Sequence, residues 1–135
     1  MIEIATIIAA PLGAALLADM GAEVIKIEPI GGDPFRGMLA GLGAARVNVG
    51  KRSLSVNMKT EAGRKMVLDL LKDADVMIHN FRPGVPERLG ISYAQVSSIN
   101  PKIIYLQCNG YGSKGPGALR PVSYTHLTLP TICSV

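Results

Sequence analysis

One short segment, Asn80-Phe81-Arg82, carries side chains suited to holding a nucleotide. It follows an apolar stretch at residues 76–78 and precedes Pro83-Gly84. The Asn amide can donate and accept hydrogen bonds, the Phe ring offers a flat face for a purine, and the Arg guanidinium presents a planar fork for phosphate. The same residues also fit an ordinary Pro-Gly turn, so the spacing alone is only moderately specific.

A second candidate site surrounds Lys59, at the start of a predicted helix. Backbone N–H groups at a helix start attract anions, and a neighbouring Lys adds positive charge, so Lys59 is predicted to contact phosphate or pyrophosphate. Lys51 and Arg52 stand before the preceding strand. A solvated basic edge explains these cations equally well from the sequence alone.

The remaining reactive side chains form no catalytic set. His79 is predicted to be a buried or edge strand residue rather than a base, and Cys108 a core residue rather than a nucleophile. Glu23, Glu28 and Asp33 show no obvious pairing, and two cysteines make neither a disulfide framework nor a metal set. No catalytic or metal-binding residue is therefore predicted.

The glycines do not mark a known phosphate-binding loop. Gly41-Leu42-Gly43 lacks a third Gly and does not follow the first strand, and the first turn, at residues 5–12, has no Gly-x-Gly. A Walker sequence is also absent. The Gly-rich residues 29–50 are too long for a simple connector and are predicted to form a functional loop.

The elements that must position these residues alternate between strand and helix. Apolar and β-branched segments predict strands, and apolar residues at helical spacing predict helices. Strands are expected at residues 2–7, 23–28, 54–58, 76–78 and 103–106, and helices at 12–20, after Thr60, at 85–89 and at 93–99. The simplest α/β arrangement is a Rossmann-like parallel sheet, whose ligands bind outside the carboxyl ends of the strands. The binding edge is therefore predicted at the loops that open at Ala5, Pro29, Met58, Asn80 and Asn109.

Composition indicates one small soluble domain. The chain has 135 residues, and its net charge of +4 favours an anionic partner without identifying it. The longest uncharged stretch, residues 4–18, contains Pro11 and is too short for a membrane helix, and no basic leader precedes it. Because only 4% of the residues are aromatic and the cations are dispersed, nucleic-acid binding is not supported. We expect a cytoplasmic protein without a membrane segment.

Residues 122–135 differ from the rest because they contain no Lys, Arg, Asp or Glu. Their sequence is what a read-through of a transposon-end sequencing adapter would encode, and a short Thr- and Leu-rich strand is the alternative. We interpret residues 1–121 as a native but partial domain and residues 122–135 as a non-native tail. Tyr124, His126 and Cys133 would then carry no chemistry.

Residues 2–121 resemble the N-terminal part of the large domain of family III CoA-transferases. That family includes formyl-CoA and carnitine CoA-transferases and the related α-methylacyl-CoA racemases. The matching segments occur in order along the chain, at residues 17–29, 31–34, 50–53, 57–60, 80–84, 88–90 and 110–112. The resemblance implies a Rossmann-like domain that binds coenzyme A or acyl-CoA as substrate, with no permanently bound cofactor. In the full-length protein it implies a homodimer of interlocked chains.

The resemblance also implies the residues that contact CoA. They are Ile8, Ala9, Val56, Asn57, Met58, Lys59, Asn80, Phe81, Arg82 and Arg88. Many relatives carry Arg directly after the Glu that ends the second strand, whereas this chain has Pro29. Phosphate binding is therefore expected to rely more on the remaining cations, Lys59, Arg82 and Arg88.

In transferases of this family an Asp attacks the acyl-CoA thioester, and CoA then passes through an aspartyl intermediate to a carboxylic acid acceptor. The racemases instead use a His in a Gly-His-Asp segment just after the position of Pro121, where transferases have Gly-Tyr-Asp. The nucleophilic Asp is expected beyond Pro121, so the chain is predicted to bind CoA but to be inactive alone. A racemase fragment and a truncated nucleotide-binding module without function stay open as alternatives.

Overall fold

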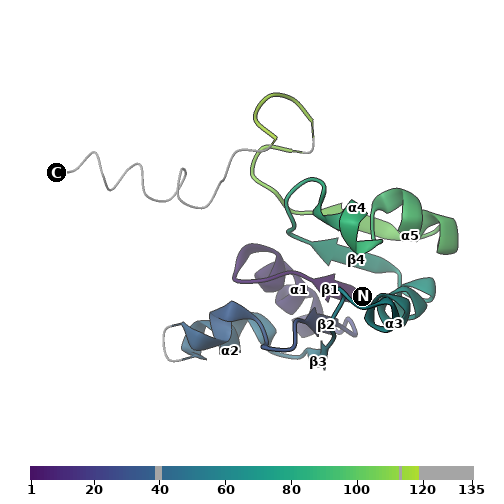
Figure 1. Cartoon of the computed structure of the whole chain (residues 1–135). Helices are drawn as coiled ribbons and strands as arrows, with labels where there is room; N and C mark the ends of the chain where they lie inside the picture. Colours follow the sequence, from purple (N-terminus) through teal and green to yellow (C-terminus); the bar gives the residue numbers. More distant parts are fainter. Residues whose placement is uncertain (39–40, 113, 119–135) are drawn as a thin grey trace.

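A computed structural model describes residues 1–38, 41–112 and 114–118 as a parallel sheet with helices on both faces (Figure 1). The strand order is β3-β2-β1-β4-β5, and every neighbouring pair is parallel. The strands are β1 (Ile2–Ile4), β2 (Ile25–Glu28), β3 (Arg52–Ser55), β4 (Val76–His79) and β5 (Ile104–Gln107). The predicted Rossmann-like α/β sheet is thus confirmed. The proposed tail at residues 122–135 lies outside the described residues.

The first half of the chain builds β1, α1 (Ala9–Asp19) and β2. The predicted helix is present but begins three residues before the expected Leu12, and Gly21 follows it with a φ of 97°. The expectation that Ile7 extends the first strand is wrong. Ile7 lies in the turn after β1 with a φ of 70°, which strand geometry does not allow.

The expectation that residues 29–50 form one long loop is also wrong. This segment forms a 3₁₀ helix, η1 (Pro34–Gly37), and a short helix, α2 (Leu42–Asn48). Phe35, Ala44 and Val47 form a small buried cluster against which Ile7 packs. The many glycines concealed the helix in the sequence, because α2 is stabilised by this packing rather than by local helix propensity.

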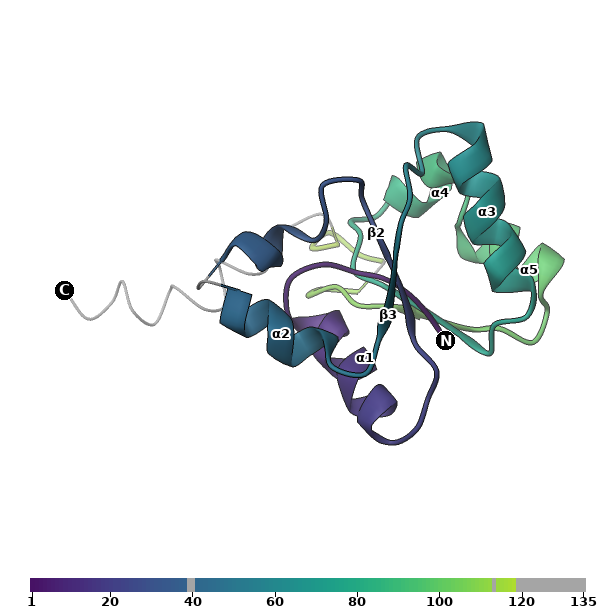
Figure 2. The same cartoon turned by 90° about the horizontal axis from the view of Figure 1, so that it is seen from below.

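The second half of the chain covers the other face of the sheet with α3 (Glu61–Lys72), α4 (Val85–Leu89) and α5 (Tyr93–Ile99). Figure 2 shows these helices on the side of the strands opposite α1 and α2. The predicted bounds of α4 and α5 are confirmed. Ser92 starts α5 with a capping box in which Gln95 returns the hydrogen bond.

The two faces of the sheet have different interiors. On the α3 side, large aliphatic side chains such as Val67, Leu71 and Met77 form the main core and are completely buried. On the α1 side the apolar residues packed against the strands are mostly small, with Ala10 and Ala14 packed against Ile78. Small side chains let α1 approach the strands closely.

Candidate functional site

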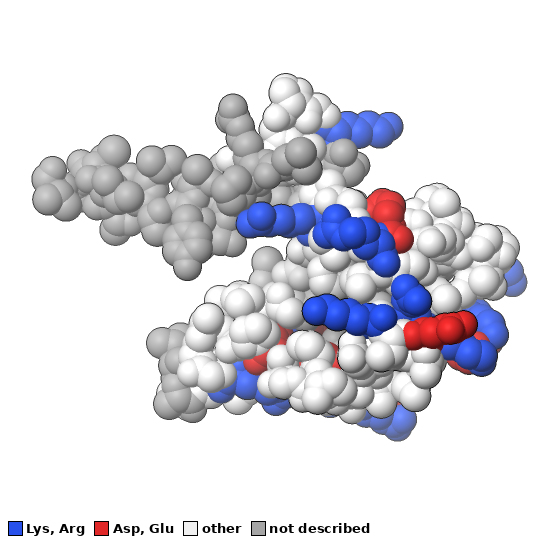
Figure 3. Space-filling view, viewed as in Figure 1, with Lys and Arg blue, Asp and Glu red and all other residues white. Residues whose placement is uncertain are grey.

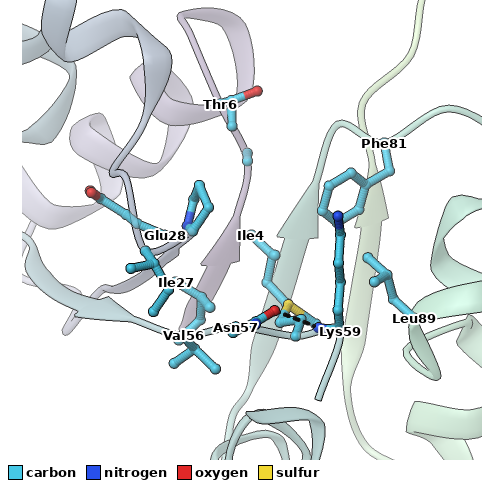
Figure 4. Close-up of a pocket in the computed structure, with 13 residues that line it drawn as sticks. Ile4, Thr6, Ile27, Glu28, Val56, Asn57, Lys59, Phe81 and Leu89 are labelled. Carbon is cyan, nitrogen blue, oxygen red and sulfur yellow. Dashed lines mark hydrogen bonds between the residues drawn. The ribbon is translucent and has the colours of Figure 1, made fainter.

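A pocket of about 470 Å³ opens at the carboxyl ends of the strands (Figure 4). Its volume falls within the usual range for small-molecule sites. Its walls come from β1, β2, the loop after β3 and the segment after β4. The lining residues are Ile4, Ala5, Thr6, Ile27, Glu28, Pro29, Ile30, Val56, Asn57, Met58, Lys59, Phe81 and Leu89. The predicted binding edge is therefore the edge where the structure places a pocket.

Half of the residues predicted to contact CoA line this pocket together: Val56, Asn57, Met58, Lys59 and Phe81. Ile8 and Ala9 are exposed at the start of α1, and Arg82 and Arg88 are exposed beside α4. None of these four lines the pocket. On the face shown in Figure 3, Lys and Arg side chains gather over the middle of the molecule.

The loop between β3 and α3 presents Lys59 to the pocket. The Lys59 N–H donates to Asn57 Oδ1 at 3.1 Å, and Thr60 caps α3 by accepting from the Gly63 N–H at 3.1 Å. A Cβ on Gly63 would overlap the backbone oxygen of Asn57, so this close approach requires glycine. In Figure 4 the Lys59 side chain extends along one side of the pocket toward Phe81. Lys59 and Glu28 are the charged residues of the lining.

Asn80 does not line the pocket but joins the ends of β1 and β4. Its Nδ2 donates to the Thr6 carbonyl at 2.8 Å, and its Oδ1 accepts from the Thr6 N–H at 3.1 Å. The predicted ligand-binding amide is therefore engaged with the backbone of a residue that does line the pocket.

His79 packs against Phe81 and accepts a hydrogen bond from its backbone. The prediction that His79 is a buried strand residue is confirmed, since it is completely buried and burial lowers its pKa to about 4. Its Nδ1 accepts from the Phe81 N–H at 3.2 Å, and its ring stacks against Phe81 at 5.6 Å between centroids. On its other side the Tyr105 ring meets it edge-on. A neutral imidazole is required because Nδ1 must keep a free lone pair.

Sequence reasoning missed the pocket residues that end β1 and β2. Glu28, for which no pairing was expected, is buried and forms two hydrogen bonds with Arg36, at 2.6 and 3.0 Å. Burial alone would raise the pKa of Glu28, but the hydrogen bond and charge of Arg36, the charge of Lys26 and a backbone hydrogen bond from Asp33 together outweigh burial and lower it. The sequence did indicate that the carboxyl ends of the parallel strands meet at one edge. That signal pointed to the loops at this edge and not to the last residues of the strands.

A buried network of four charges lies beneath the site, between the sheet and α1. Lys26 Nζ contacts Glu3 at 2.7 Å and Asp33 at 3.0 Å, and Lys51 Nζ contacts Glu3 at 2.5 Å. The four side chains are at most 2% exposed. The interpretation of Lys51 as part of a solvated basic edge is therefore wrong, and Asp33 is paired. Burial lowers the pKa of Lys51, and the Glu3 carboxylate partly offsets that shift.

The described residues bring neither a nucleophilic cysteine nor a metal-binding cluster to the pocket. Cys108 is partly buried against the small α1-side cluster, and burial raises the pKa of its thiol, as expected for a core residue rather than a nucleophile. The described part of the chain holds no group of three or more His, Cys, Asp or Glu that could bind a metal ion. No helix in this part is long and apolar enough to cross a membrane.

Sequence comparisons give a consistent set of relatives. The chain is 44% identical over 131 residues to an acyl-CoA transferase of Fusarium pseudograminearum, covering 86% of this chain and 29% of that protein. It is 42% identical over 127 residues to the acetyl-CoA:oxalate CoA-transferase of Acetobacter aceti, covering 90% of this chain and 33% of that protein. The chain thus spans about a third of the length of these relatives.

Solved structures and a family profile agree with these relatives. The hypothetical protein Rv3272 from Mycobacterium tuberculosis superposes with a TM-score of 0.83 at 36% identity, over 89% of this chain and 35% of that one. A CAIB/BAIF family protein from Brucella suis has a TM-score of 0.80 at 38% identity, over 88% of this chain and 34% of that one. The profile of CoA-transferase family III matches residues 1–127. With its parallel sheet and its pocket at the carboxyl edge, the chain belongs to CoA-transferase family III.

Proposed function

We propose that this chain forms the coenzyme A-binding part of an enzyme that transfers CoA from an acyl-CoA donor to a carboxylic acid acceptor. The observation that carries the proposal is the pocket at the carboxyl ends of β1, β2 and β3, within a chain of this family. Its walls are mainly apolar, as a purine requires, and Lys59 supplies a cation for phosphate. In the full-length protein we expect two chains to interlock as a homodimer.

Phe81 and Lys59 are proposed to hold the nucleotide together. Figure 4 shows the Lys59 side chain extending toward the Phe81 ring along one side of the pocket. Arg82 and Arg88 are exposed and unpaired by any carboxylate among the described residues, so they are free to meet phosphates that extend beyond the pocket. Asn57 has its Oδ1 occupied by the Lys59 N–H and contributes chiefly by shaping the loop.

The chemical step requires an Asp that we place outside residues 1–121. One oxygen of its carboxylate attacks the thioester carbonyl carbon, the C–S bond breaks, and CoA leaves as a thiolate while a mixed anhydride remains. The thiolate then attacks the aspartyl carbonyl, which releases the donor acid as a carboxylate and forms an aspartyl-CoA thioester. The acceptor carboxylate regenerates the Asp by the reverse sequence. This chain holds the nucleotide end of CoA throughout.

Titration calorimetry of the 135-residue chain with CoA tests the binding proposal. We expect saturable binding that is weakened about tenfold by Lys59→Ala. Lys102→Ala is the matched control, because Lys102 is exposed at the start of β5, on the opposite edge of the sheet. Absence of saturable binding would remove the proposal for this chain, and equal affinities for the two variants would remove Lys59 from the site.

Sequencing the source gene across codon 121 tests the placement of the nucleophile. We expect an open frame that continues with Gly-Tyr-Asp and contains an Asp further downstream. A Gly-His-Asp segment would instead identify a racemase. Genomic codons for residues 122–135 followed by a stop would contradict the transferase proposal, because the protein would then contain no such Asp.

A further inference from the structure

The turn between β1 and α1 has an unusual backbone. Ile7 has a φ of 70° and is the one non-glycine residue with a positive φ in the described part of the chain. This region is a genuine outlier for a β-branched side chain and costs energy that the surrounding structure must supply. The preceding residues, Ala5 and Thr6, line the pocket. The strained residue therefore directly follows two residues of the pocket wall.

Asn80 holds this turn from the β4 side. It is bonded to both backbone groups of Thr6, donating from Nδ2 at 2.8 Å and accepting at Oδ1 at 3.1 Å. Two opposed hydrogen bonds to one residue fix both the position and the rotation of its peptide groups. Seventy-four residues separate the partners in sequence, so this restraint exists only in the folded sheet.

Asp33 holds the same turn from the opposite side. Its Oδ1 and Oδ2 accept from the Ile7 N–H at 3.3 and 3.2 Å, and Oδ1 also accepts from the Phe35 N–H at 2.9 Å. The carboxylate is buried and pairs with Lys26 Nζ at 3.0 Å, and the same Nζ donates to the Ala5 carbonyl at 2.8 Å. Charged acceptors make the stronger hydrogen bonds, and Asp33 is itself fixed by its buried partner.

The Ile7 side chain is anchored as well. It packs against Phe35 and Val47, which lie on η1 and α2. Residues 29–50 therefore contact both the side chain and the backbone N–H of Ile7. The segment thus supports the turn that precedes α1.

We propose that Asp33 and Asn80 are positioning residues that clamp the strained turn and so set the shape of the nucleotide pocket. This inference rests on the proposed function, because it concerns the affinity of the same pocket for CoA. Without either clamp the turn relaxes, the competent conformation becomes a minor fraction, and the apparent dissociation constant rises in inverse proportion to that fraction. Asn80 thus acts through Thr6 and not by contact with the ligand.

The test compares CoA affinity in four variants of the chain by calorimetry. We expect Asn80→Ala to weaken CoA binding about tenfold and Ile7→Gly to leave it within about threefold, because glycine adopts a positive φ without strain. In the Ile7→Gly background, Asn80→Ala is expected to cost only about threefold. Leu71→Ala, at the end of α3 farther from Lys59, is the control for lost stability and should leave the affinity unchanged, measured where all the variants are folded.

Equal losses from Asn80→Ala in the wild-type and Ile7→Gly backgrounds would overturn the inference, since Asn80 would then act without the strained turn. Amide hydrogen exchange tests the clamp independently of any ligand. We expect the Thr6 and Ile7 N–H groups to be protected in the wild type. Protection of Thr6 should fall about tenfold in Asn80→Ala, and that of Ile7 should fall about tenfold in Asp33→Asn, with α3 amides as the internal reference.

These measurements separate the two proposals. If the wild type does not bind CoA, the proposed function fails, and the exchange data alone decide whether the clamp exists. Unchanged exchange at Thr6 and Ile7 in both variants would overturn the clamp even if CoA binds. Loss of protection in both variants supports it.

Discussion

The two faces of the sheet are stabilised by different means. The face beneath α3 and α5 buries large aliphatic side chains, among them Val67 and Leu71, and makes no buried ion pair among the described residues. The face beneath α1 buries alanines together with Glu3, Lys26, Asp33 and Lys51. Apolar burial is non-directional, whereas charged hydrogen bonds demand fixed geometry. The first face supplies most of the apolar pocket wall, including Ile4, Ile27 and Val56, and the second face fixes the turn that carries Ala5 and Thr6.

The largest expected loss of stability comes from a substitution in the buried charge network on the α1 face of the sheet. Lys26→Met leaves Glu3 with Lys51 alone and leaves Asp33 without a cation, so we expect about 4 kcal/mol of lost stability in urea unfolding. Lys72→Met is the control, because Lys72 and its partner Asp69 are exposed, and it should cost less than about 1 kcal/mol. Similar losses from both variants would show that the buried network does not distinguish this face.

The apolar face should respond to the loss of volume. Leu71 is completely buried in the main core, so Leu71→Ala is expected to cost about 3 kcal/mol by urea unfolding, through lost burial and the cavity that remains. Met66 lies on the same helix but is half exposed, and Met66→Ala should change stability by about 0.5 kcal/mol or less. Unlike Lys26→Met, Leu71→Ala should leave the exchange of the Ile7 N–H unchanged relative to global stability.

The free energy of unfolding should depend on pH because the His79 imidazole, stacked against Phe81, is neutral in the folded protein. His79 has a folded pKa of about 4 against an ordinary value of 6.5. The unfolded chain therefore binds the proton first, and stability should fall as the pH drops from about 6.5 toward about 4. We expect a loss of about 2.5 kcal/mol between about pH 7.5 and about pH 4.5, beyond that of His79→Asn.

His79→Asn is the matched reference because its Oδ1 can still accept from the Phe81 N–H while the side chain no longer titrates. Comparing the unfolding free energies of the two proteins at each pH separates the titration of the His79 imidazole from the titration of the carboxylates. Parallel pH profiles would mean that His79 is protonated as readily in the folded state as in the unfolded state, which would contradict its burial.

The smallest expected effect is a change in CoA affinity at the carboxyl edge of the sheet, rather than a change in the stability of either face. Arg88→Ala should weaken CoA binding about tenfold, or about 1.4 kcal/mol, with little change in stability because the side chain is exposed. Calorimetry of Arg88→Ala beside Arg52→Ala gives the comparison, since Arg52 is exposed at the start of β3 and pairs with Glu23. Unchanged affinity in Arg88→Ala would remove Arg88 from the site.

Most elements could be predicted because their signals are local. The α3 pattern of Val67, Leu70 and Leu71 has helical spacing, Thr60 is a capping residue, and the bounds of α4 and α5 follow from nearby turn residues. The helix α2 could not be found in this way. Its stability comes from Phe35 and from contact with α1, which the glycines around it do not reveal.

The candidate site was predicted in part. Lys59 and Phe81 line the pocket as expected, because loops that follow parallel strands meet at one edge. Ile4, Ile27 and Leu89 were not expected there, because an apolar wall depends on which strands are neighbours. Lys26 and Glu3 alternate with apolar residues, a pattern that equally fits a solvated strand face.

Local features of the sequence specify the alternating α/β architecture, the edge of the sheet at which the pocket opens and the family. These follow from local periodicity, capping residues and ordered motifs, which need no knowledge of distant contacts. Only the tertiary structure decided that Asp33 and Asn80 meet at one strained turn, that four charges neutralise each other beneath α1, and that Lys59 and Phe81 share a pocket. The physical reason is that these arrangements depend on strand order, which places side chains within bonding distance across as many as 74 residues of sequence.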